Sequence, residues 1–205
     1  MDGHERSIYL GEVATQCRYA LGAVAQLNNA LNSLNQCQEN SIDWQQRGFV
    51  QGEVFRSIHS LLTHASNISR IFWPPKSSGN TSLISIERGR DLRTYIGLLD
   101  DQHPLKKRTL RDHLEHFDER LDHWRETSKR RNFAQDNIGP WGSIAGIEES
   151  DVMRWYDPIA RRFIFRGESF DIQELVSAID MLLPIAETGR DRSWQEGVRD
   201  LQENN

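Results

Sequence analysis

Apolar side chains recur at intervals of three and four residues along most of the chain before position 130, which is the spacing of one helix face. This pattern predicts two long helices, at 7–35 and 44–73, a shorter helix at 85–101 and a fourth helix at 105–130. Pro74 ends the second helix because proline lacks a backbone N–H donor. Helices with one apolar face bury it by packing together, so these elements are expected to form a bundle.

The helical period stops after residue 131. The segment 132–150 is rich in Gly and Asn and predicts a long ordered loop. From about 150, bulky and polar residues alternate around Asp157-Pro158, which favours a small β-hairpin. Apolar residues at helical spacing recur over 171–188 and predict a fifth helix. Residues 189–205 are expected to be a loose tail.

The pattern therefore predicts one domain over 1–205 with an all-α fold, a bundle of four to five helices with a small late β-hairpin. The bundle core spans 5–130, and the loop, hairpin and last helix of 131–188 are appended to it. A chain of 205 residues and 23.8 kDa suits a single domain. Its apolar fraction of 37% is enough to build a core.

Composition bears on the partners and the cellular location that are expected for the chain. The net charge is -5, which argues against a broad nucleic-acid-binding face but leaves room for a local basic patch. No window reaches the roughly 20 apolar residues of a membrane span, and the first residues carry no secretory pattern. Cys17 and Cys37 would lie about 30 Å apart on one helix, too far to form a disulfide. Buried thiols and a reducing, cytoplasmic location are expected.

The segment 110–124, "LRDHLEHFDERLDHW", carries three histidines among acids and arginines. Its apolar seam accounts for the core contacts of the predicted helix and consists of Leu110, Leu114, Phe117, Leu121 and Trp124. The polar side is either an ordinary solvated face or a place for chemistry. An imidazole moves protons near neutral pH, and a guanidinium stabilises a phosphate that gains charge. Arg111 and His116 cannot meet side by side on one straight helix, but both could reach a groove shared with a second helix or subunit.

The sequence "RDHLEH" over Arg111–His116 resembles the R-[N/D/H]-x3-H form of the RX4–6H motif of HEPN domains. The resemblance implies an all-α bundle that forms a homodimer and cleaves RNA as a metal-independent, cofactor-free endoribonuclease. In such an enzyme the 2′-hydroxyl attacks the neighbouring phosphate. Carried over to this sequence, Arg111 stabilises the phosphate, Asp112 orients the pair and His116 is the general acid and base. Toxin-like members imply an antitoxin-type protein partner.

Basic residues near the motif favour RNA as the partner. Lys106, Lys107 and Arg108 precede it by about one turn, where an RNA backbone would be held. Further basic clusters occur at 129–131, at 161–162 and at Arg166. Three aromatic residues either stack on RNA bases or pack the hairpin against the bundle: Trp141, Trp155 and Tyr156. Packing is favoured for Trp155 and Tyr156.

Two other readings stay open. The chain could be a non-catalytic helical interaction or binding protein with a HEPN-like fold. It could also be a metal-dependent enzyme, because His113 and His116 share a helix face and one of His59 and His64 could join them. Cleavage of RNA in EDTA separates these readings from the metal-independent nuclease.

Overall fold

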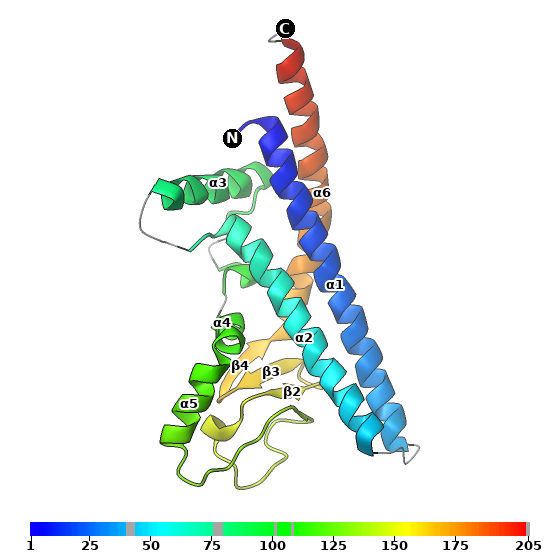
Figure 1. Ribbon diagram of the computed structural model, residues 1–205. Helices are drawn as coiled ribbons and strands as arrows, with labels where there is room; N and C mark the ends of the chain where they lie inside the picture. The colour runs from blue at the N-terminus through cyan, green and yellow to red at the C-terminus, as the bar shows by residue number, and fades with distance from the viewer. Residues whose placement is uncertain (40–43, 76–79, 101, 108, 204–205) are drawn as a thin grey trace. The chain divides into compact units, whose positions relative to one another are not determined.

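The computed structural model describes residues 1–39, 44–75, 80–100, 102–107 and 109–203 (Figure 1). Six α-helices lie in these ranges: α1 (Gly3–Glu39), α2 (Trp44–Phe72), α3 (Asn80–Ile96), α4 (Thr109–Glu115), α5 (Phe117–Thr127) and α6 (Ile172–Glu203). The strands are β1 (Asn137–Ile138), β2 (Trp155–Asp157), β3 (Arg162–Phe165) and β4 (Glu168–Asp171), and two 3-10 turns are η1 (Pro104–Lys106) and η2 (Glu149–Asp151). A mostly helical chain with β-structure late in the sequence is therefore confirmed, although its sheet is larger than a hairpin.

The chain divides into two compact units. The first, here the helical unit, comprises Met1–Gly22, Thr63–Arg108 and Ser177–Asn205. The second, here the mixed unit, comprises Ala23–Leu62 and Thr109–Val176. The helices α1, α2 and α6 contribute residues to both units, whereas α4, α5 and the sheet belong to the mixed unit alone.

The helical unit is built on side chains repeated at helical spacing. Its fully buried apolar residues include Leu10, Val13, Cys17, Ile68, Phe72, Leu92 and Ile179. The backbone at the start of α1 lies directly against the backbone near the end of α6. A Cβ on Gly3 would lie only 2.6 Å from the backbone nitrogen of Gly197. Arg6 joins the same region by an ion pair with Glu196 at 3.1 Å. Two glycines thus allow an approach that any larger side chain would obstruct.

The expected loose tail was wrong for its described part, because α6 continues to Glu203. Pro184 lies inside this helix. Gly189 looks like a helix stop in the sequence, but a Cβ there would lie 2.9 Å from the Cγ2 atom of Ile96. The glycine serves close packing of α6, so its presence does not mark a helix end. The third helix is shorter than expected at its end, where Gly97 follows with a φ of 73°.

The sheet of the mixed unit has the order β1-β2-β3-β4. β1 pairs with β2 in parallel, and the other two pairings are antiparallel. The hairpin expected around Asp157-Pro158 corresponds to β2 and β3. A second hairpin joins β3 to β4 through Arg166 and Gly167, whose φ values of 51° and 85° match the two left-handed residues of a tight hairpin turn.

Both faces of β3 are covered. Phe163 and Phe165 are 1% exposed, and Phe163 packs edge-on against Phe55 of α2 with ring centroids 6.3 Å apart. Ile164, on the opposite face, forms a cluster with Ala134, Val152, Trp155 and Ile147. The segment expected to be only a loop therefore covers the second face of the sheet and supplies β1. Trp155 and Tyr156 are buried, which confirms that they pack, whereas Trp141 is 39% exposed.

The expected continuous helix over 105–130 was wrong. It separates into η1, α4 and α5, and His116 lies at the break with φ -101° and ψ 39°. The N–H of His116 still donates to the carbonyl of Asp112 at 3.1 Å, and the N–H of Arg120 donates to His116 at 3.2 Å. Apolar spacing is preserved across the break. Residues 109–127 contain no Pro, Gly or Ser, the usual signals of a sharp kink, so periodicity alone does not reveal it.

Candidate active site at the break between α4 and α5

The motif residues lie on both sides of the helix break. Arg111 and Asp112 belong to α4, and His116 is the residue between α4 and α5. Asp112 is exposed, whereas the side chain of Arg111 lies outside the described residues. The imidazole of His116 is 56% exposed, and its Nδ1 atom lies 3.2 Å from Oε1 of Glu119. The break therefore presents an accessible imidazole with a carboxylate beside it.

Glu119 is a functional candidate that the motif did not single out. It stands three residues after His116, in the first turn of α5. A carboxylate that accepts a hydrogen bond from one ring nitrogen holds an imidazole in one tautomer and orientation. The i,i+3 spacing of His116 and Glu119 is the sequence signal that could have identified this pair.

The predicted RNA-contacting residues belong to the other unit. Lys106 is the last residue of η1 and Lys107 follows it, and both side chains are exposed. Arg108 lies outside the described residues. Lys106 and Lys107 are part of the helical unit, whereas Asp112 and His116 are part of the mixed unit.

A second polar cluster joins α4 and α5 to the sheet. The ring of His113 stacks on Phe165 with centroids 5.2 Å apart, and its side chain is 17% exposed. Arg120 donates from Nε to Nδ1 of His113 at 3.3 Å, and Nε2 of His113 lies 3.3 Å from a carboxylate oxygen of Glu168. Nδ1 of His113 thus accepts from Arg120, and Nε2 is the ring nitrogen that faces the Glu168 carboxylate.

Arg166 completes this cluster from the hairpin turn. Its Nη2 atom lies 2.8 Å from Nδ1 of His123, and its Nη1 atom donates to the carbonyl of Arg120 at 3.3 Å. Burial lowers the pKa of the Arg166 guanidinium, as does the charge of Arg120, while Asp151 opposes the shift. An arginine remains a cation at neutral pH despite such a shift. Two guanidinium groups thus lie at α5: Arg120 belongs to this helix, and Arg166 reaches it from the hairpin turn.

A small cavity lies in the mixed unit beside the helix break. Its volume is about 130 Å³, and its lining consists of Phe55, Ile58, His59, Leu114, Phe117, Arg154 and Phe163. Leu114 and Phe117 precede and follow the break at His116. The guanidinium carbon of Arg154 lies 5.0 Å from the ring centroid of Phe117. Asp136 holds that guanidinium, with Nε 2.7 Å from Oδ1 and Nη2 donating to Oδ2 at 3.1 Å.

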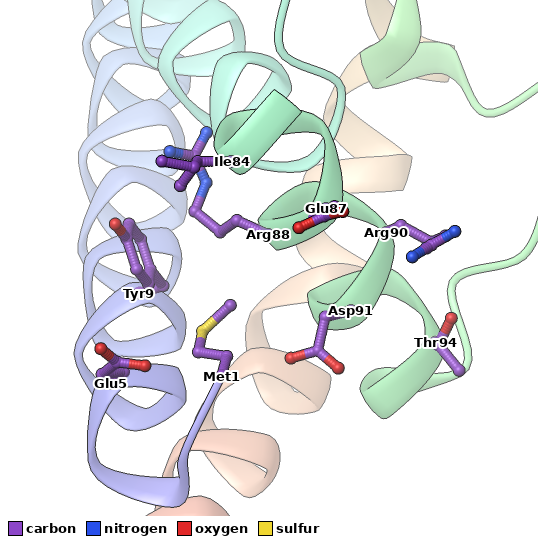
Figure 2. A pocket seen from close by; sticks show the side chains of 9 residues that line it. All are labelled: Met1, Glu5, Tyr9, Ile84, Glu87, Arg88, Arg90, Asp91 and Thr94. Atoms are coloured by element: carbon purple, nitrogen blue, oxygen red, sulfur yellow. The ribbon is translucent and has the colours of Figure 1, made fainter. Parts of the chain in front are cut away.

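A larger pocket of about 700 Å³ lies in the helical unit between α1 and α3 (Figure 2). Figure 2 shows Glu5 and Tyr9 on α1 facing charged side chains of α3, and the lining consists of Met1, Glu5, Tyr9, Ile84, Glu87, Arg88, Arg90, Asp91 and Thr94. The guanidinium carbon of Arg88 lies 5.1 Å from the ring centroid of Tyr9. Among the described residues, this lining contains neither histidine nor cysteine. The helix break, by contrast, presents an imidazole, which gains and loses a proton near neutral pH.

The histidines considered as metal ligands have other partners. His113 pairs with Glu168, His116 with Glu119, and Nδ1 of His64 lies 2.8 Å from the side-chain oxygen of Gln16. Within the described ranges, no three His, Cys, Asp or Glu side chains are grouped so that they could hold a metal ion.

Two further findings concern membrane-spanning helices and similarity to known proteins. No helix in the described part of the chain is long and apolar enough to cross a membrane. Comparison with protein-family models, with curated proteins and with solved structures gives no match.

Proposed function

We propose that this protein is a HEPN-like, metal-independent endoribonuclease that cleaves RNA phosphodiesters as a homodimer. The observation that supports the proposal most directly is the exposed imidazole of His116, which stands at the helix break with Glu119 beside it. It occupies the histidine position of the R-D-x3-H sequence that resembles the HEPN motif.

The geometry suits a general base. With a proton on Nδ1 donated to Glu119, the lone pair of His116 is on Nε2. That atom takes the proton of a ribose 2′-hydroxyl, whose oxygen then attacks the adjacent phosphorus. The bond to the 5′-oxygen breaks, and the leaving oxygen takes up a proton from an imidazolium. The products are a 2′,3′-cyclic phosphate and a 5′-hydroxyl, with no metal ion in the step.

Cationic side chains support binding of the phosphate chain. In the proposed enzyme, Arg111 stabilises the charge that develops on the phosphate, Asp112 orients the pair, and a second subunit supplies an equivalent set. Arg120 and Arg166 are held close to α5 and provide local positive charge in an acidic chain. Lys106, Lys107 and Arg108 would add contacts with the backbone of the RNA.

The test is cleavage of 5′-labelled single-stranded RNA by purified protein in EDTA. We expect cyclic-phosphate products, and we expect His116→Ala to lower the rate by about 100-fold to 10,000-fold, the usual contribution of a general acid or base. Its melting temperature should stay within about 2 °C of the wild type, because a surface substitution changes stability little. His4→Ala, an exposed histidine of the helical unit, is the matched control and should keep full activity.

Three results would contradict the proposal. A folded dimer that cleaves no RNA from a mixed pool would favour the non-catalytic binding protein. Cleavage that disappears in EDTA and returns with a divalent ion would favour the metal-dependent enzyme. Equal loss of activity in His4→Ala and His116→Ala would remove His116 from the reaction.

A further inference from the structure

The cavity beside the helix break has a mostly apolar lining with two polar residues. Ile58, Phe55 and Phe163 line it with apolar side chains that are 0%, 7% and 1% exposed. The polar residues of its lining are His59, which is exposed, and Arg154, which is partly exposed. A ligand that fits this arrangement has a flat apolar body and polar atoms along one edge.

The volume favours a ligand of about one ring. The cavity of about 130 Å³ is slightly smaller than an engineered apolar cavity of about 150 Å³ in another protein, which holds one benzene molecule. Sites for whole drug-sized ligands start at about 300 Å³. One six-membered ring therefore matches this volume more closely than a fused double ring does.

The aromatic lining favours a nucleobase. Single-stranded RNA is recognised mainly by bases that leave the strand and stack on aromatic side chains or on the plane of an arginine. The rings of Phe55, Phe117 and Phe163 line the cavity, and Arg154 lies over Phe117. Each stacked base is worth about 1–3 kcal/mol in proteins that bind single strands.

Arg154 supplies a donor in a fixed orientation. Its Nε and Nη2 atoms face Asp136, so the guanidinium plane is set by that ion pair. A guanidinium only donates hydrogen bonds. Both uracil and cytosine carry a ring carbonyl oxygen that accepts such a bond. We infer that this cavity binds one pyrimidine base of a single-stranded RNA, an inference that rests on the proposed function and names its substrate more closely.

The position of the cavity gives the bound base a role in cleavage. Leu114 and Phe117 line it from the last turn of α4 and the first residue of α5, on either side of His116. A base held there fixes the RNA backbone relative to the imidazole. The enzyme is therefore expected to cut next to pyrimidines.

The experiment measures binding without cleavage. Fluorescein-labelled 2′-O-methyl tetranucleotides of U, C or A are titrated with wild-type protein, and anisotropy is recorded. The methyl group blocks the attacking oxygen, so affinity is measured whether or not the protein is a nuclease. We expect the U and C probes to bind at least fivefold more tightly than the A probe.

Two variants and one control locate the preference. Leu114→Trp fills the cavity and should remove the difference between U and A. Arg154→Gln removes the guanidinium, should reduce the same difference, and remains informative if Leu114→Trp does not fold. Leu99→Trp, at a position 73% exposed in the helical unit, is the matched control and should keep the preference.

The outcomes separate the two proposals. Equal binding of U and A, a preference for A, or no binding of any probe overturns the pyrimidine site. A preference that survives both variants also overturns it. Cleavage of ordinary RNA without regard to base means that the pyrimidine site fails and the nuclease stands. Pyrimidine preference in a protein that cleaves no RNA means that the pyrimidine site stands and the nuclease proposal fails.

Discussion

Removing the carboxylate of Asp157 should destabilise the mixed unit more than an ordinary turn substitution does. Its Oδ1 atom accepts from the backbone N–H groups of Ile159 and Ala160, each at 2.9 Å, and its Oδ2 atom accepts from Trp141 at 3.0 Å. The residue is only 7% exposed. One side chain thus satisfies three donors and joins the turn between β2 and β3 to the segment that follows β1.

The expected magnitude follows from these bonds. A hydrogen bond to a charged group contributes about 1.5–3 kcal/mol net. The residues Ile159 and Ala160 are exposed, so water replaces part of what their N–H groups lose. Asp157→Ala should therefore cost about 2–4 kcal/mol of unfolding free energy. Asp157→Asn keeps an oxygen for the turn and loses the charge and the bond to Trp141, so about 1–2 kcal/mol is expected.

The same contacts predict a pH dependence. Burial raises the pKa of Asp157, but the backbone N–H groups of Ala160, Trp141 and Ile159 lower it, and Arg162 adds to the lowering. The net result is a pKa below the ordinary value of 3.8. The unfolded chain then binds the proton more readily, so this stabilisation is present above about pH 4 and is lost as the pH falls through the folded-state value.

Urea unfolding of the three proteins between pH 7 and pH 2.5 checks this reasoning. The gap in unfolding free energy between wild type and Asp157→Asn should shrink as the pH falls below about 4. A cost below about 0.5 kcal/mol for Asp157→Ala at pH 7 would refute the structural role. A gap that stays constant at all pH values would refute the electrostatic part.

Three further predictions concern other parts of the molecule. Gly197→Ala should lower stability by about 1–3 kcal/mol because its Cβ would lie 2.8 Å from the backbone nitrogen of His4, whereas Gly22→Ala, with open space around it, should be neutral or stabilising in thermal unfolding. Burial raises the pKa of Cys17 to about 12, so iodoacetamide should label this thiol at pH 8.5 only after unfolding. The contribution of the buried neutral thiol to the unfolding free energy should fall as the pH rises from 9 towards 12. Rapid labelling of the native protein would contradict this prediction. Arg166→Ala should weaken RNA binding and reduce the slope of log affinity against log salt by about one, and an unchanged slope would exclude a phosphate contact.

The long helices could be predicted because apolar spacing reports which side of a helix is buried. The predicted ranges 7–35 and 44–73 agree closely with α1 and α2. The break at His116 could not be predicted, because the hydrogen bonds on both sides of it preserve the apolar period. The covering of β3 by Ala134 and Val152 depends on contacts between distant segments, which no local pattern encodes.

The candidate site was predictable only in its local part. The motif points to Asp112 and His116 directly, and the spacing of Glu119 is a local signal. The bonds from His113 to Glu168 and from His123 to Arg166 join residues 55 and 43 positions apart. The fold brings these groups together through the second hairpin, which the sequence pattern did not predict.

That hairpin has a consequence for anyone who would strengthen the protein. Arg166 occupies a left-handed backbone conformation that asparagine or glycine adopts at lower energy, a difference of about 1–2 kcal/mol for an ordinary side chain. Replacing it with asparagine would relax the loop but would remove the bonds that its guanidinium makes to His123 and Arg120 of α5. At this single position, a turn with less backbone strain and a helix bonded to the turn are opposing design goals.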